Sequence, residues 1–261
     1  PAKARWLLKT GWSAQNLKFR FAPDKRLIPA HRYLAHLMMN TMLAPLKRPE
    51  NCSVVSIFTP CELLHEAGLS PYNVEAFSCY LTASAAERAC LQQAEDQGIS
   101  ETLCSYHKTF IGAADRGILP RPKCIVYTNL VCDANLLTFR YLADLYQVPV
   151  FSIDVPFGQS HDNVKYVAEQ LEELAVFLEK CTGHPIDEDS LKERLCISRR
   201  TLENISRFQA LRKDRCIPTD LVTPLYEGMT NNILLGTKEE EGYTSRLLKD
   251  VSQASPAKGK K

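Results

Sequence analysis

The sequence predicts an α/β fold: a small parallel sheet flanked by helices, with helical segments at both ends of the chain. Apolar residues make up 45% of the 261 residues, which is enough to bury a substantial core. Four short β-rich runs are separated by amphipathic helical stretches, and strands connected in this way pair in parallel. The expected strands are Cys52–Phe58, Tyr72–Phe77, Lys123–Thr128 and Val148–Ile153.

The helical pattern divides the chain into three expected parts. Residues 1–50 are expected to be helical, because Leu34, Leu37 and Met38 recur on one helix face. Residues 51–158 hold the alternating strands and helices. Residues 159–261 are expected to be a helical region with a polar tail. There a long helix precedes two shorter ones, near Ser190–Leu195 and Arg200–Arg212, and the hydrophobic pattern fades over roughly the last 25 residues.

Local signals suggest where the middle helices begin. Thr59-Pro60-Cys61-Glu62 has the spacing of a capping box, in which Thr59 is the N-cap and the Glu62 side chain bonds back to the N-cap amide. Ser84 has the same relation to Glu87. Ser100 is expected to cap a helix reaching about Arg116, and Asp133 a helix reaching about Tyr146.

Several function classes are excluded by composition and motif. A net charge of +2 gives no reason to expect nucleic acid, and no apolar stretch approaches the roughly 20 residues of a membrane helix. The sequence contains no phosphate-cradling G-x-x-x-x-G-K loop, no H-E-x-x-H and no C-x-x-C. The ten cysteines do not cluster as in a secreted disulfide scaffold, so we expect a cytoplasmic protein.

Two cysteines occur where a sheet presents ligands. Cys132 lies in a loop directly after the strand Lys123–Thr128 and directly before a helix, and Cys104 lies in the opening turn of a helix. Ligands bind outside the carboxyl ends of parallel strands. Helix N-termini lower thiol pKa values and favour anionic groups. The pair therefore suits an iron–sulfur centre, although two cysteines cannot complete a cluster.

Several segments, in the same order, resemble the 2-hydroxyacyl-CoA dehydratase D-component family. Thr59–Gly68 is similar to the family's T/V-P-x-E-[IL]-[IL]-x-A-x-G signature, and Cys104-Ser105-Tyr106 to its first cluster-cysteine motif. Cys132-Asp133, followed by Phe139–Asp144 and Val148–Pro156, is similar to the second. Benzoyl-CoA reductase subunits belong to the same superfamily.

The resemblance implies a cofactor, partners and site residues. Cys104 and Cys132 would ligate a 4Fe-4S cluster, and Glu62 would be a carboxylate near the substrate, unless the capping box already explains it. The partners would be a homologous second dehydratase subunit, an ATP-dependent iron–sulfur activator protein and an acyl-CoA substrate, without nucleic acid or membrane. One electron would convert the 2-hydroxyacyl-CoA thioester into a ketyl radical that expels the hydroxyl group, giving a 2-enoyl-CoA.

One departure from the family leaves alternatives open. The family has a third cluster cysteine in a second α/β domain, whereas this sequence stops at Lys261, where that domain would begin. We therefore expect the second domain to be absent, and Cys181, Cys196 and Cys216 lack the context of the third ligand. The alternatives are a non-catalytic fragment or partner module, and a subunit of a benzoyl-CoA reductase or another double-cluster reductase.

Overall fold

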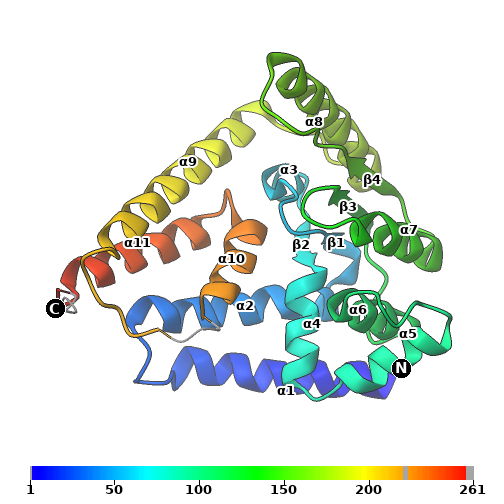
Figure 1. Cartoon of the computed structure of the whole chain (residues 1–261), viewed down its shortest axis with the longest axis horizontal. Coiled ribbons are helices and arrows are strands. Elements are labelled where there is room, and N and C mark those ends of the chain that lie inside the picture. Colours follow the sequence, from blue (N-terminus) through cyan, green and yellow to red (C-terminus); the bar gives the residue numbers. More distant parts are fainter. Residues whose placement is uncertain (1, 220–222, 257–261) are drawn as a thin grey trace.

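The structure, a computed structural model, describes residues 2–219 and 223–256 (Figure 1). Its centre is a four-stranded sheet in the order β2-β1-β3-β4, and every neighbouring pair is parallel. The strands are β1 (Cys52–Val55), β2 (Ser70–Asn73), β3 (Cys124–Thr128) and β4 (Val150–Ile153). The predicted α/β class and the parallel sheet are confirmed.

The strand order places a switch point between β1 and β3. From β1 the chain moves to β2 on one side, and then crosses back to β3 on the other side of β1. The loops that follow β1 and β3 therefore leave the carboxyl edge of the sheet in opposite directions. In open parallel sheets this divergence forms the crevice in which ligands bind.

Helices cover both faces of the sheet. Successive side chains of each strand point to opposite faces, and each face has its own hydrophobic core. Val54 and Ile125 face one core, while the adjacent Val55 and Val126 face the other. The first core receives helices α2, α4, α6 and α7, and the second receives α3 and α8. The bounds of these helices are α2 (Pro29–Lys47), α3 (Cys61–Glu66), α4 (Val74–Ala83), α6 (Ser105–Asp115), α7 (Ala134–Tyr146) and α8 (His161–Thr182).

The remaining helices frame the sheet (Figure 1). Helix α1 (Ala2–Phe21) lies along α2, and α5 (Glu87–Asp96) packs on α6. Helices α9 (Glu188–Leu211) and α11 (Lys238–Gln253) pack on each other, and α11 also packs on α2, forming a third core. Helix α10 (Thr223–Leu234) packs on α2 and α11 and reaches α3 and α4, and a 3-10 turn, η1 (Pro49–Asn51), precedes β1. Within these ranges, no helix combines the length and the apolar character needed to cross a bilayer.

Three expectations from the sequence differ from the structure. The strand expected over Tyr72–Phe77 ends at Asn73, because the Asn73 side chain accepts a hydrogen bond from the Ala76 amide (2.8 Å) and begins α4. The two helices expected near Ser190–Leu195 and Arg200–Arg212 form the single helix α9. The fading pattern expected near the C-terminus is also wrong. Helix α11 buries Tyr243, Leu247 and Val251 at intervals of four residues between charged positions.

The expected side-chain caps do not form at four helices. Ser100 lies before α6, which begins at Ser105 without a side-chain cap. Pro60, rather than Thr59, precedes α3, and the Thr59 hydroxyl turns into the sheet edge. Helix α5 begins at Glu87 without a cap from Ser84, whose hydroxyl donates to Tyr80 O (2.9 Å). Asp133 holds the position before α7 but makes no capping hydrogen bond. At each site the local pattern is overridden by a tertiary contact or by a different backbone path.

Candidate functional site

A chain of buried hydroxyls joins the two loops at the switch point. The Ser56 hydroxyl, after β1, accepts a hydrogen bond from the Thr128 amide at the end of β3 (2.9 Å). The Thr59 hydroxyl lies 3.1 Å from that of Ser56 and donates to Val126 O (3.4 Å). These contacts hold the start of α3 against the end of β3. Sequence reasoning missed them, because no pattern shows which strand lies beside β1.

The loop that carries Cys132 is held in an unfavourable backbone conformation. Val131 has φ +73°, a conformation that costs a β-branched residue energy, and its side chain is exposed. The fully buried Asn135 side chain donates hydrogen bonds to Thr128 O (3.1 Å) and Leu130 O (3.3 Å), in the residues that precede Val131. The half-buried Cys132 thus lies in the loop that follows β3, and the first turn of α7 holds this loop in place.

Cys104 directly precedes the first turn of α6 and is exposed. Its side chain makes no capping hydrogen bond, so amides of this turn are available to a bound anion. The turn is fixed on its inner side, where the Ser78 hydroxyl of α4 donates to Tyr106 O (2.8 Å).

His107 connects the two cysteine segments. It lies on α6 one turn after Cys104, and its Nε2 is 3.9 Å from Cys132 Sγ. Its Nδ1 is 2.8 Å from the hydroxyl of Thr138 on α7. Burial lowers the pKa of His107, so the ring is neutral near pH 7 and donates from one nitrogen at a time. Sequence reasoning placed His107 on the apolar face of its helix. The missing signal was its spacing of three residues from Cys104.

The two thiols suit an iron–sulfur centre as part of its ligand set. Thiolate sulfur is the ligand that such clusters use, and helix N-termini favour their negative charge. The part of the chain that the structure describes contains no group of three or more His, Cys, Asp or Glu side chains able to hold a metal ion. Cys104 and Cys132 would supply two of the ligands of such a centre.

Glu62 lies on the same edge of the sheet but is engaged elsewhere. Its Oε1 accepts a hydrogen bond from the hydroxyl of Ser198 on α9 (2.8 Å). Gly236, with φ +83°, comes so close that an added Cβ would lie 2.8 Å from Glu62 Cγ. The capping-box explanation for Glu62 is wrong, because the carboxylate packs against α9 and the turn after α10. The structure does not bring it into contact with either candidate ligand.

Two hollows adjoin each other at Ala83 of α4 and Tyr226 of α10, and one of them reaches the first turn of α6. One, of about 520 Å³, is lined by Ser105 and Tyr106, the residues that follow Cys104. Tyr106 is held there by Cys79, whose thiol lies 3.6 Å from the Tyr106 hydroxyl. The other, of about 550 Å³, shares Ala83 and Tyr226 with the first and lies between α1, α2, α4 and α10.

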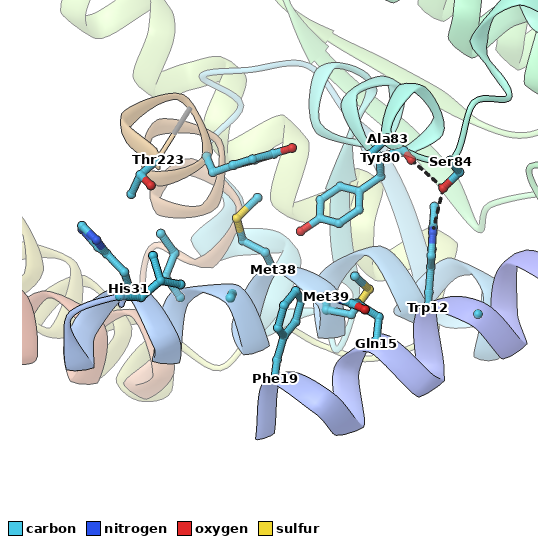
Figure 2. A pocket seen from close by; sticks show the side chains of 15 residues that line it. Trp12, Gln15, Phe19, His31, Met38, Met39, Tyr80, Ala83, Ser84 and Thr223 are labelled. Carbon is cyan, nitrogen blue, oxygen red and sulfur yellow. Dashed lines mark hydrogen bonds between the residues drawn. The ribbon is translucent and has the colours of Figure 1, made fainter. Parts of the chain in front are cut away.

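The second cavity is mainly apolar (Figure 2). Phe19 of α1, Met38 and Met39 of α2 and Tyr80 of α4 surround its centre. At one end the Trp12 indole donates to the Ser84 hydroxyl (3.2 Å), which satisfies that ring nitrogen. Neither Cys104 nor Cys132 lines either hollow, but the hollow beside Ser105 includes the residue that follows Cys104, whereas the second cavity contains no residue of α6.

Comparisons with known proteins match most of the chain to one family. Residues 56–261 match the sequence profile of the family described as 2-hydroxyglutaryl-CoA dehydratase, D-component. The chain is 23% identical over 168 residues to the (R)-phenyllactyl-CoA dehydratase alpha subunit of Clostridium sporogenes. That match covers 61% of this chain and 41% of the relative.

Two further relatives have different reactions in their names. The chain is 26% identical over 177 residues to a subunit of the benzoyl-CoA reductase of Thauera aromatica, covering 62% of this chain and 41% of the relative. It is 26% identical over 161 residues to the alpha subunit of the lactoyl-CoA dehydratase of Anaerotignum propionicum, a match that covers 60% of this chain and 36% of the relative. The chain thus matches less than half the length of each relative.

Proposed function

The chain belongs to the 2-hydroxyglutaryl-CoA dehydratase D-component family, and on this premise we propose that it is part of an iron–sulfur subunit of a 2-hydroxyacyl-CoA dehydratase. The proposed reaction removes water from a 2-hydroxyacyl-CoA and yields a 2-enoyl-CoA. The proposed cofactor is a 4Fe-4S cluster with Cys104 and Cys132 among its ligands. A bound cluster would supply the single electrons needed for a radical elimination.

The observation that carries the proposal is the meeting of two distant cysteine segments at the switch point. Cys132 follows β3, Cys104 precedes α6, and His107 of α6 contacts the Cys132 sulfur (3.9 Å). Packing of α6 on α7 brings them to the same edge of the sheet. A shared ligand would lie in the crevice that open parallel sheets use for binding.

The chain's own residues would bind and orient the reacting groups. Amides of the first turn of α6 would donate to anionic sulfur, and His107 would donate from Nε2 to the Cys132 thiolate while its Nδ1 accepts from Thr138. The hollow beside Ser105 and Tyr106 would take the thioester end of the substrate. Glu62 would act as a carboxylate near the substrate only if the Ser198 hydrogen bond opens.

The proposed partners follow from the relatives, whose names describe them as subunits. We propose a homologous second dehydratase subunit, an ATP-dependent iron–sulfur activator protein and a cytoplasmic location. The second candidate function is a reductase, because the similarity to the benzoyl-CoA reductase relative covers as much of the chain as the dehydratase match does.

An anaerobic turnover assay separates these functions. The complete protein, with its second subunit and activator, is supplied with phenyllactyl-CoA, lactoyl-CoA or benzoyl-CoA, and the products are identified by mass spectrometry. Loss of one water from a 2-hydroxyacyl-CoA supports the dehydratase. Reduction of benzoyl-CoA alone would contradict it in favour of the reductase. No turnover of any thioester, with the cluster loaded, would leave the non-catalytic module as the correct function.

A further inference from the structure

The apolar cavity between α1, α2, α4 and α10 is a second candidate binding site, and the proposed reaction makes no use of it. Its volume is about 550 Å³, which falls within the range of roughly 300–1,000 Å³ that small-molecule sites occupy. Protein interiors are close-packed and contain few voids larger than a water molecule. A mainly apolar space of this size therefore has room for a small organic molecule.

One face of α2 lines the cavity along its length. His31 and Met39 stand at the two ends of this face, about 12 Å apart at 1.5 Å per residue. Between them, Leu34, Ala35 and Met38 follow the spacing of a single helix face. Methionine side chains are flexible and polarisable and contact aromatic rings favourably, so this lining can pack against an alkyl or an aromatic ligand.

His31 places a polar atom at one end of this apolar lining. The residue is 5% exposed, and Figure 2 shows its ring on the same side of α2 as Met38, at the end of the cavity far from Trp12. Within residues 2–219 and 223–256, its Nδ1 is buried and has no hydrogen-bond partner. A buried polar atom without a partner is costly, and a ligand that bonds to this nitrogen would remove that cost.

The other nitrogen of the His31 ring shows which hydrogen bond Nδ1 can make. Nε2 lies 3.4 Å from Oε1 of Glu227 on α10, and the same carboxylate accepts a hydrogen bond from the Tyr243 hydroxyl. A carboxylate only accepts hydrogen bonds, so the ring carries its proton on Nε2. The neutral ring then offers Nδ1 as an acceptor, and its partner must be a donor.

The charges around the cavity favour a neutral ligand. Among the described residues that line it, none is Lys, Arg, Asp or Glu. An anionic ligand beside His31 would be buried without a lining cation, and the Glu227 carboxylate already occupies the other side of the ring. Burial of such an uncompensated charge is expensive, whereas a hydroxyl group satisfies Nδ1 without bringing a charge.

We propose that the apolar cavity binds a neutral amphipathic small molecule, whose alkyl or aromatic body lies along α2 and whose hydroxyl group donates a hydrogen bond to His31 Nδ1. The site is separate from the proposed cluster and does not depend on the proposed function. Phe19 of α1 and Tyr80 of α4 contact the body of the ligand from the sides opposite α2.

The test uses tryptophan fluorescence of the whole chain carrying Trp6→Phe. This substitution removes an exposed tryptophan and leaves Trp12, which lines the cavity, as the single one. The ligands are n-octanol, methyl octyl ether, which lacks the hydroxyl proton, and n-octanoate, which carries a charge. We expect n-octanol to change the emission saturably, with a Kd roughly 3- to 10-fold lower than that of the ether, and octanoate to bind more weakly than n-octanol.

The three titrations have outcomes that overturn different parts of the proposal. The absence of a saturable change with n-octanol would overturn the site itself. Equal Kd values for n-octanol and the ether would overturn the hydrogen bond to His31. Tighter binding of octanoate than of n-octanol would overturn the neutral class of ligand and show that His31 binds a carboxylate.

Variants locate the bound molecule. His31→Leu should raise the Kd for n-octanol by the same roughly 3- to 10-fold and leave that for the ether unchanged, whereas His36→Leu, on the same helix but outside the cavity, should change neither. Ala35→Phe fills the cavity and should abolish binding, and Ala14→Phe, at an exposed position of α1, is its control. Circular dichroism checks the folding of each variant. Unchanged binding in folded Ala35→Phe would overturn the cavity as the site, and the ligand comparison decides the role of His31 even where His31→Leu fails to fold.

Discussion

At the residue scale, the candidate site depends on side chains with little local sequence signal. Cys104 and Cys132 were selected because their segments resemble the cluster-cysteine motifs of the family, and their role as ligands stays a prediction. His107 was not selected, because its contact with Cys132 requires α6 to pack on α7. The capping-box interpretation of Glu62 was wrong for the same reason. Ser198 is 136 positions away and reaches Glu62 only through the placement of α9.

The first residue-scale prediction concerns Asn135, which supports the Cys132 loop. Asn135→Ala removes two hydrogen bonds from a fully buried side chain, to Thr128 O and Leu130 O. We expect the free energy of unfolding to fall by about 2 kcal/mol, because the buried Thr128 carbonyl loses this donor, whereas the part-buried Leu130 carbonyl keeps the Cys132 amide. Alkylation of Cys132 by iodoacetamide should also become faster. Leu137→Ala, at an exposed position of the same helix, should change stability by less than about 0.5 kcal/mol.

The second residue-scale prediction concerns Glu240, a buried carboxyl in α11. Burial and the nearby Glu227 raise its pKa from 4.5 to about 8. The folded state therefore holds a proton that the unfolded state releases, and this group's contribution to stability declines as pH rises from about 4.5 to 8. Glu240→Gln removes the charge and keeps the shape. It should stabilise the protein at pH 8 by about 1–3 kcal/mol.

Urea unfolding of wild type and Glu240→Gln at several pH values measures this effect. The difference between their free energies of unfolding should be small near pH 4 and should grow toward pH 8. A constant difference across that range would show that Glu240 titrates normally in the folded protein.

At the element scale, alternating hydrophobicity was a good guide to strands but a poor guide to where they end. Strands β1, β3 and β4 lie within the predicted runs, and Tyr72–Asn73 lies within β2. The helix α4 was missed because its apolar start, Val74 to Phe77, also suits a strand. The deciding feature is the Asn73 cap, a single hydrogen bond to Ala76 N. A strand produces a hydrophobic pattern over many residues of the sequence, whereas a helix cap depends on a single residue.

The element-scale prediction concerns the close packing of α5 on α6 at Gly112. A Cβ added at Gly112 would overlap the backbone oxygen of Cys90, so the two helices would have to separate. We expect Gly112→Ala to lower the free energy of unfolding by about 3 kcal/mol or more. Gly11→Ala is the control: its Cβ meets nothing within 4 Å, and it should raise stability by about 0.5–1 kcal/mol through helix propensity. Equal midpoints for both variants in urea would contradict this account of the α5–α6 contact.

At the scale of the whole molecule, sequence pattern predicted the fold class but not the strand order. The order β2-β1-β3-β4 arises from long crossovers, and it alone shows that the loops after β1 and β3 diverge. The third core, formed by α2, α9 and α11, joins residues near both ends of the described chain. This third core was not predicted, because the many charged residues of α11 make the four-residue spacing of its buried residues hard to recognise in the sequence. The division into 1–50, 51–158 and 159–261 stays a prediction.

The most direct test of the central claim is the visible iron–sulfur absorption after anaerobic reconstitution with iron and sulfide. The complete protein is compared with its Cys104→Ser, Cys132→Ser and Cys124→Ser variants, each confirmed as folded by circular dichroism. The account predicts that the absorption is lost in the first two variants and kept in the third, because Cys124 lies at the other end of β3. Equal absorption in all three variants would contradict a centre shared by Cys104 and Cys132.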